Sequence, residues 1–172
     1  MVLLTIMSAS SIPGWESTHD LEAVAVDLNT QPPLFCIGAL LTVVGTSLRI
    51  ISYRCLGRFF TFELSIRDSH RLVTSGPYSV VRHPSYAAGC IFLLGSLWCQ
   101  LGPGSIWACL GLWGNMFGFI VGAGQICLAA YASYIAAVLR VGREDRMLRE
   151  HFGREWETWA QKTPYKVIPL IY

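Results

Sequence analysis

Three long apolar runs separate the polar segments of the chain and predict membrane-spanning helices. A helix needs roughly 17–25 mostly apolar residues to cross a bilayer. Residues 34–52 meet this length, and residues 86–101 are fewer but carry no charge. Residues 105–139 form an uncharged run of 35 residues. As one helix this run would be about 52 Å long, too long for a hydrocarbon core of about 30 Å. It therefore predicts either two spans or one span with an interfacial piece.

The basic residues fall into two groups and favour one of these solutions. Of the 13 Lys and Arg residues, six lie within residues 49–82 and seven within residues 140–166. The positive-inside rule places both groups on the cytoplasmic side, so an even number of spans must lie between them. We therefore expect residues 86–101 to cross outward, residues 119–139 to return, and residues 105–118 to lie at the far interface. Three tryptophans suit an aromatic belt there: Trp98, Trp107 and Trp113.

Glycines are concentrated in residues 111–124. Three of them are spaced four residues apart: Gly114, Gly118 and Gly122. Such a face of small residues allows close helix packing. A dinucleotide-binding loop would need a preceding strand in a βαβ unit, which the sequence does not indicate. We therefore interpret these glycines as packing positions.

The composition of the chain is also typical of a small integral membrane protein. The 172 residues are 53% hydrophobic and 14% charged, whereas soluble domains contain about 25% charged residues. This composition argues against disorder, and a net charge of +2 argues against a nucleic-acid binder. Residues 1–33 contain four acidic residues and no Lys or Arg. They predict a loosely ordered acidic tail without the positive region of a secretory signal peptide. Residues 34–172 then form an all-α membrane domain of about three transmembrane helices plus interfacial helices.

Cysteine and histidine do not indicate a metal site. The six cysteines include no C-x-x-C pair, and five lie in apolar runs, where they act as small hydrophobic residues. The four histidines are scattered and do not supply the clustered ligands that zinc requires. We therefore predict no metal.

Polar residues gather in two segments, residues 56–86 and residues 140–172, and each directly adjoins a predicted span. A membrane enzyme would meet a water-soluble cosubstrate and a lipid-borne one at such a place. Gly76-Pro77 predicts a turn, and Pro84 suits the first turn of a helix. A structural interpretation stays open, in which His83 packs locally and Arg82 is an ordinary juxtamembrane charge.

The second polar segment contains an apolar stripe at helical spacing, interrupted in helix propensity by Gly153. Its members are Leu148, Phe152, Trp156 and Trp159. One interpretation is an amphipathic helix that lies on the membrane surface. Arg140 and Glu144 are four residues apart, so a simple ion pair along one helix face is also possible.

In order along the chain, these residues resemble the isoprenylcysteine carboxyl methyltransferase family. The resemblance rests on "HRLVTSGPYSVVRHPSY" (residues 70–86), an apolar hairpin, an acidic pair, "FG-x-x-W" ending at Trp156, and the closing "TPYKVIPLIY". It covers about two thirds of the chain, residues 56–172. The "RHP-x-Y" element alone is less specific, because it recurs in related phospholipid methyltransferases. The chain departs from the family pattern in having one span before residue 56 and an acidic run reduced to Glu144-Asp145.

The resemblance implies S-adenosylmethionine as methyl donor and a prenylated C-terminal cysteine as acceptor. It also implies a multi-pass protein of the endoplasmic reticulum membrane, in contact with membrane lipid, with its donor site on the cytoplasmic side. By position it implies these donor-site residues: Glu63, His70, Leu72, Val73, Tyr78, His83, Pro84, Ser85, Tyr86 and Glu144. Arg140 falls at the position that contacts the prenylcysteine, and Arg82 belongs to the motif and would help to order the site.

The chemistry of such a reaction suits these residue types. An α-carboxylate has a pKa of about 3.3–3.7 and is already ionised at neutral pH, so no general base is needed. Positioning alone can supply roughly 7–11 kcal/mol. The guanidinium of Arg140 offers a fixed fork for the carboxylate. Glu144 offers charge for the donor sulfonium, and Tyr78 or Tyr86 offers a ring face.

Three alternatives remain open from the residues. A phospholipid or other lipid-amine N-methyltransferase would first have to deprotonate its acceptor, with His83 or a carboxylate as base. A shortened, non-catalytic family member would bind no donor. A reductase with a nicotinamide cofactor fits the pattern of the last segment less well than a methyltransferase does.

Overall fold

The computed structural model describes residues 33–60 and 71–171. Residues 1–32 of the predicted acidic tail, and the predicted donor-site residues Glu63 and His70, lie outside this part. Within the described residues the regular secondary structure is helical throughout, which confirms the predicted fold class.

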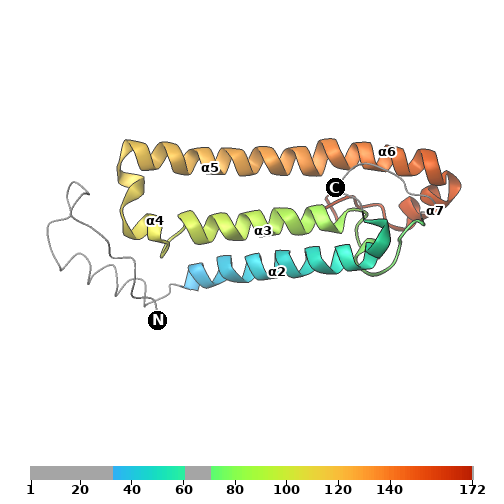
Figure 1. The fold of residues 1–172 in the computed structure, drawn as a ribbon, viewed down its shortest axis with the longest axis horizontal. Coiled ribbons are helices and arrows are strands. Elements are labelled where there is room, and N and C mark those ends of the chain that lie inside the picture. Colours follow the sequence, from blue (N-terminus) through green and yellow to red (C-terminus); the bar gives the residue numbers. More distant parts are fainter. Residues whose placement is uncertain (1–32, 61–70, 172) are drawn as a thin grey trace.

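Among the described residues, three helices are long and apolar enough to cross a membrane, as predicted. They are α2 (Pro33–Leu56), α3 (Pro84–Leu101) and α5 (Met116–Tyr134). Figure 1 shows them side by side with nearly parallel axes. The end of α2, the start of α3 and the continuation of α5 lie at one end of this bundle, which we name the polar end (Figure 1). The described members of both basic groups therefore lie at the same end, as the charge pattern predicted.

Residues 105–118 make a series of turns at the far end of the bundle and form no further span. Ser105 caps the one-turn helix α4 (Ile106–Cys109) by accepting the amide of Ala108 at 3.1 Å. A 3₁₀ turn follows (Leu112–Gly114), and Asn115 caps α5. The side chains of Trp107 and Trp113 meet at this end, with ring centroids 6.3 Å apart. The prediction of a single return span after residue 101 is therefore confirmed, and the place of residues 105–118 at the far interface stays a prediction.

The predicted glycine face packs differently from the expectation. A Cβ at Gly122 would lie 2.7 Å from the ring of Trp113, and one at Gly118 would meet the carbonyl of Leu112. Both glycines thus allow α5 to fold closely onto its own preceding turn. Gly114 belongs to that turn and faces open space, so its assignment to the packing face is wrong.

Close helix packing occurs instead between α2 and α3, at glycines that the sequence analysis did not select. A Cβ at Gly45 would lie 2.5 Å from the backbone nitrogen of Phe92. A Cβ at Gly95 would lie 2.5 Å from the backbone nitrogen of Thr42. Small residues let two helix backbones approach closely, which is how helices associate where lipid removes the hydrophobic driving force. The α2–α3 pair is therefore the tight unit of the bundle.

At the polar end the chain leaves α5 through a π-helical turn (Ile135–Arg140) and continues as α6 (Val141–Phe152). Gly153 then has φ 52° and ψ −117°, a conformation that L side chains rarely adopt. This glycine ends α6 and lets α7 (Arg154–Lys162) fold back toward the bundle (Figure 1). The sequence predicted a break at this glycine but not its direction.

The apolar stripe of this segment packs onto protein. Trp156 and Trp159 of α7 are buried and form a core with Tyr78. Leu148 and Phe152 of α6 pack against the same core. The interpretation of this stripe as a membrane-surface face is therefore wrong, because its tryptophans cover the loop between α2 and α3.

Candidate functional site

The loop before α3 is held by three separate devices. Gly76–Ser79 forms a 3₁₀ turn that begins at the predicted Gly-Pro, and Pro84 occupies the first turn of α3 as predicted. The backbone N–H of Arg82 donates to the carbonyl of Tyr165 at 2.9 Å, and the N–H of His83 donates to the carbonyl of Lys166 at 2.8 Å. The C-terminal segment thus holds the backbone of the "RHP" motif in place.

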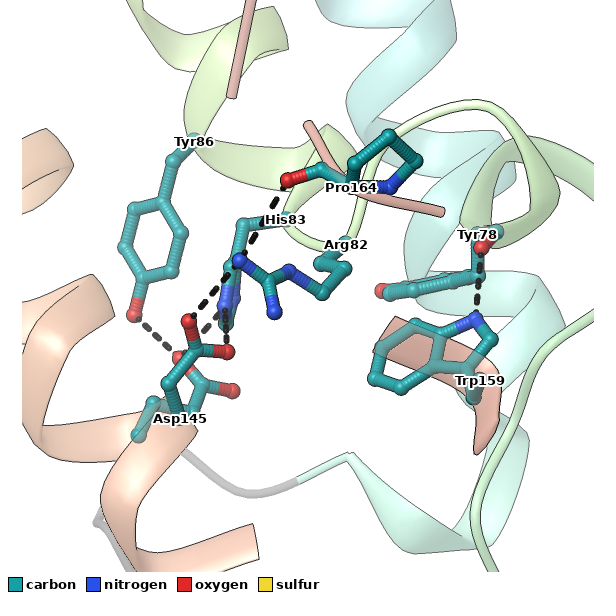
Figure 2. Close-up of polar contacts among 8 residues, drawn as sticks. Tyr78, Arg82, His83, Tyr86, Asp145, Trp159 and Pro164 are labelled. Carbon is teal, nitrogen blue, oxygen red and sulfur yellow. Dashed lines mark hydrogen bonds and ion pairs between the residues drawn. The ribbon is translucent and has the colours of Figure 1, made fainter. Parts of the chain in front are cut away.

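His83 is the centre of a group of side chains that we name the polar cluster: Arg82, His83, Tyr86, Glu144 and Asp145. The imidazole of His83 is buried, and its Nε2 lies 2.8 Å from Oδ1 of Asp145. Its Nδ1 lies 3.7 Å from Oε2 of Glu144. Figure 2 shows His83, Tyr86 and Asp145 converging from α3 and α6. The ring is therefore flanked by two carboxylates.

The first turn of α3 adds a second link to α6. The hydroxyl of Tyr86 donates to Oε2 of Glu144 at 3.0 Å, and the rings of His83 and Tyr86 are 5.9 Å apart. The side chain of Glu144 is 31% exposed, while that of Asp145 is 12% exposed. Glu144 is consequently the carboxylate of the cluster that a water-soluble ligand can reach.

Arg82 connects the polar cluster to the core of α7. Its Nη2 lies 3.5 Å from Oδ2 of Asp145 and 3.5 Å from the carbonyl of Pro164 (Figure 2). Its guanidinium carbon lies 5.3 Å from the ring centroid of Trp156, within the range of cation–π attraction. Arg82 Nε and Trp156 Nε1 are buried, and neither has a hydrogen-bond partner among the described residues. Two hydrogen-bond donors are thus left beside the cluster.

Tyr78 lies behind the cluster as part of the core. Its carbonyl accepts the indole N–H of Trp159 at 3.1 Å (Figure 2), and its hydroxyl donates to the carbonyl of Ser52 at 3.5 Å. Burial, and next the negative charge of Glu144, raise the pKa of Tyr78 above its ordinary value. Leu72 and Val73 pack against this core.

Two predicted residues lie at the edges of the site. Ser85 is half-buried, and its carbonyl accepts from Nη1 of Arg49 at 3.5 Å on the side that faces α2. Arg140 is exposed at the end of the π-helical turn, four residues before Glu144. Short π-helical turns within α-helices occur frequently at functional sites.

The sequence analysis named Asp145 only as a member of the acidic pair and did not assign it to the site. In the structure it contacts both Arg82 and His83 of the "RHP" motif. Adjacent positions on a helix point about 100° apart, so the acidic pair by itself did not indicate that Asp145 faces Arg82 and His83. The support that residues 164–166 give to Arg82 and His83 comes from their backbone carbonyls, and a backbone group has no side-chain signature in the sequence.

A separate hollow of about 440 Å³ is lined in part by Trp159. Hydroxyl side chains of Thr74, Ser79 and Thr158 line it, together with Glu155 and Lys162. No member of the polar cluster lines it, so it is not the site described here.

The cluster combines a partly exposed carboxylate with a neighbouring aromatic ring. Glu144 supplies a reachable negative charge, and the aromatic ring of Tyr86 lies beside it. The fold and the site together define a helical membrane protein whose charged site is assembled at one end of three spans.

The comparisons with known proteins agree with this class. Residues 37–113 match the model of the isoprenylcysteine carboxyl methyltransferase (ICMT) family. A probable protein-S-isoprenylcysteine O-methyltransferase from Oryza sativa subsp. indica is 30% identical over 145 residues, 78% of this chain and 61% of the rice protein. Protein-S-isoprenylcysteine O-methyltransferase B from Arabidopsis thaliana is 28% identical over 142 residues, 78% of this chain and 58% of that protein. These findings confirm the family resemblance that the sequence predicted.

Two further results define the extent of the likeness. The chain spans about three fifths of the length of these relatives. A delta(14)-sterol reductase from Mus musculus is 27% identical over 105 residues, which is 59% of this chain and 20% of the reductase. No solved structure matches the chain.

Proposed function

We propose that this chain methylates the C-terminal carboxylate of prenylated cysteine, with S-adenosylmethionine as methyl donor, at the endoplasmic reticulum membrane. One observation supports this most directly. The polar cluster joins the "RHPSY" start of α3 to the acidic pair of α6. It does so at the end of three helices among which a prenyl chain could lie. The similarity to protein-S-isoprenylcysteine O-methyltransferases supports the choice of acceptor.

The donor supplies an electrophilic methyl group on a sulfonium centre. Glu144 would place its partly exposed carboxylate near that positive charge, and Tyr86 would hold the carboxylate in position through its 3.0 Å hydrogen bond. His83 and Arg82 would form the buried wall behind these two side chains. Three further proposed donor-site residues, Tyr78, Leu72 and Val73, would support that wall from the core.

Arg140 would orient the acceptor. Its guanidinium can hold a carboxylate in a two-pronged hydrogen-bonded arrangement that a lysine cannot reproduce. An α-carboxylate with a pKa of about 3.3–3.7 is ionised at neutral pH, so no residue has to remove a proton. The chain then contributes by positioning and by excluding water, and a catalytic dyad is not required.

The test is transfer of a labelled methyl group from S-adenosylmethionine to a small prenylcysteine, with membranes that contain the chain and membranes that lack it. We expect label on the prenylcysteine that base releases, as a methyl ester does. The rate should change little near neutral pH. Base-stable label on an amine, with a rate that rises with pH, would replace the proposal with a lipid-amine N-methyltransferase. Absence of donor binding in correctly inserted protein would indicate a non-catalytic relative.

The variant Arg140→Ala tests the acceptor assignment. Hydrogen bonds to charged groups contribute about 1.5–3 kcal/mol, so we expect the KM for prenylcysteine to rise by roughly ten- to a hundredfold. Donor affinity should stay unchanged. Arg143→Ala is the matched control, because Arg143 is an exposed arginine one turn along the same helical segment. Equal effects of the two variants would remove Arg140 from the site.

A further inference from the structure

Asp145 occupies the most connected position of the polar cluster. It is buried, with 9% of its surface exposed. Its Oδ1 lies 2.8 Å from Nε2 of His83, and its Oδ2 lies 3.5 Å from Nη2 of Arg82. The two residues that it contacts are neighbours in the sequence, and they lie 62 and 63 positions from Asp145 along the chain. One carboxylate therefore attaches α6 to the start of α3.

We infer that Asp145 is a positioning residue that holds His83 and Arg82 in the orientation required for donor binding, an inference that rests on the proposed function. Burying a carboxylate is costly unless it is paired and hydrogen-bonded. Asp145 meets that condition only while both partners are in place. Movement of the His83 ring would leave the buried carboxylate of Asp145 with only one of its two partners, Arg82. Each of the two contacts therefore stabilises the other.

The geometry requires two acceptor oxygens at this position. A carboxylate accepts from Nε2 of His83 with one oxygen and faces Arg82 with the other. An asparagine of the same size has a single acceptor oxygen, and its amide group would face either Arg82 or His83 with donors. Asp145→Asn preserves the volume of the side chain, but it either loses one of the two contacts or forces His83 into the tautomer whose Nε2 carries no proton.

Four groups surround the imidazole that Asp145 orients. Asp145 and Glu144 face it from α6, Arg82 precedes it in the loop, and Tyr86 lies one turn later on α3. Acceptance by Asp145 requires the Nε2 atom of His83 to carry a proton. Its Nδ1 then points toward Glu144, the carboxylate that we place nearest the donor. Asp145 thus determines which nitrogen of His83 faces the donor side.

The experiment compares three variants of the full chain in membranes. Asp145→Asn removes one acceptor, Asp145→Glu retains the carboxylate, and Glu150→Gln removes a negative charge from an exposed position of the same helix. For each we would measure KM for the donor, kcat and the thermal unfolding midpoint. We expect Asp145→Asn to raise the donor KM by about tenfold or more, as loss of a charged hydrogen bond would. Asp145→Glu should recover part of the affinity, and Glu150→Gln should match the wild type.

A purely structural role would give a different result. Asp145→Asn would then lower the unfolding midpoint, while the folded protein kept the donor KM of the wild type. That outcome would overturn the inference. An inactive wild type would overturn the proposed function instead, since no variant is needed to observe it.

A second measurement needs neither activity nor a variant at residue 145. In a chain whose other histidines are replaced (His19→Gln, His70→Gln and His151→Gln), ¹⁵N spectra report the protonation of the His83 ring directly. We expect a protonated, hydrogen-bonded Nε2. A ring whose Nε2 carries no proton, or one that alternates between tautomers, would contradict the assignment of Asp145.

Discussion

The contact between α2 and α3 makes a sharp prediction about Gly45. In Gly45→Ala the new Cβ would lie 2.5 Å from the backbone nitrogen of Phe92, and 2.8 Å from both its Cα and the carbonyl oxygen of Ala88. All three atoms belong to the backbone of α3, so no side-chain rotation can relieve the contact. The two helices have to separate or tilt.

The size of the effect follows from these distances. Ordinary carbon contacts are about 3.5–4.0 Å, so the helices must separate locally by about 1 Å. Overpacking of this kind costs about 1–3 kcal/mol of folding stability. The strain also reaches the polar end, because Tyr78 is hydrogen-bonded to Ser52 near the end of α2 and α3 begins directly after His83. We therefore expect weaker donor binding as well as lower stability.

The assay is thermal unfolding of the purified chain in detergent, together with equilibrium binding of labelled donor. Gly124→Ala is the matched control, since a Cβ at Gly124 meets nothing within 4 Å. Alanine is favoured over glycine in a helix by about 1 kcal/mol, so Gly124→Ala should be neutral or stabilising. If both variants unfold at the same temperature and bind donor equally well, the close packing of α2 on α3 is refuted.

Two other predictions concern single side chains. Trp159→Phe removes the 3.1 Å indole hydrogen bond to Tyr78, and Trp113→Phe removes the equivalent 3.0 Å bond to Leu101 at the far end. Each should cost about 1 kcal/mol or more of stability, but only Trp159→Phe should weaken donor binding in a titration. The raised pKa of Tyr78 means that the folded chain keeps this proton after the unfolded chain has lost it. The stabilisation that this pKa difference contributes to the folded chain is complete below the ordinary tyrosine pKa of about 10, and it decreases as the pH rises above that value. The free energy of unfolding, measured from pH 8 to 11, should therefore decrease less steeply with pH in Tyr78→Phe than in the wild type. Equal slopes in the two proteins would contradict this.

Part of the site could be predicted from the sequence, because its residues either follow local backbone chemistry or belong to the motif that carries the family resemblance. Pro84 at the start of α3 and the turn at Gly76 follow from local backbone chemistry. His83, Tyr86 and Glu144 were selected by resemblance, and the structure brings the three together. Asp145 was not assigned, because an acid beside another acid gives no local sign of which one turns inward.

The apolar runs and the placement of the basic residues by themselves determined three helices and their shared polar end. Whether a segment spans a membrane, and which way it faces, depend on its own apolar length and on the charges beside it. Both can therefore be predicted from the linear sequence. The tertiary structure alone decided which glycines allow close packing, and that the tryptophans of α7 turn inward onto Tyr78. It also decided that Asp145 links Arg82 to His83. These features depend on the distance between backbones that are remote in the sequence, and they exist only once the helices are packed.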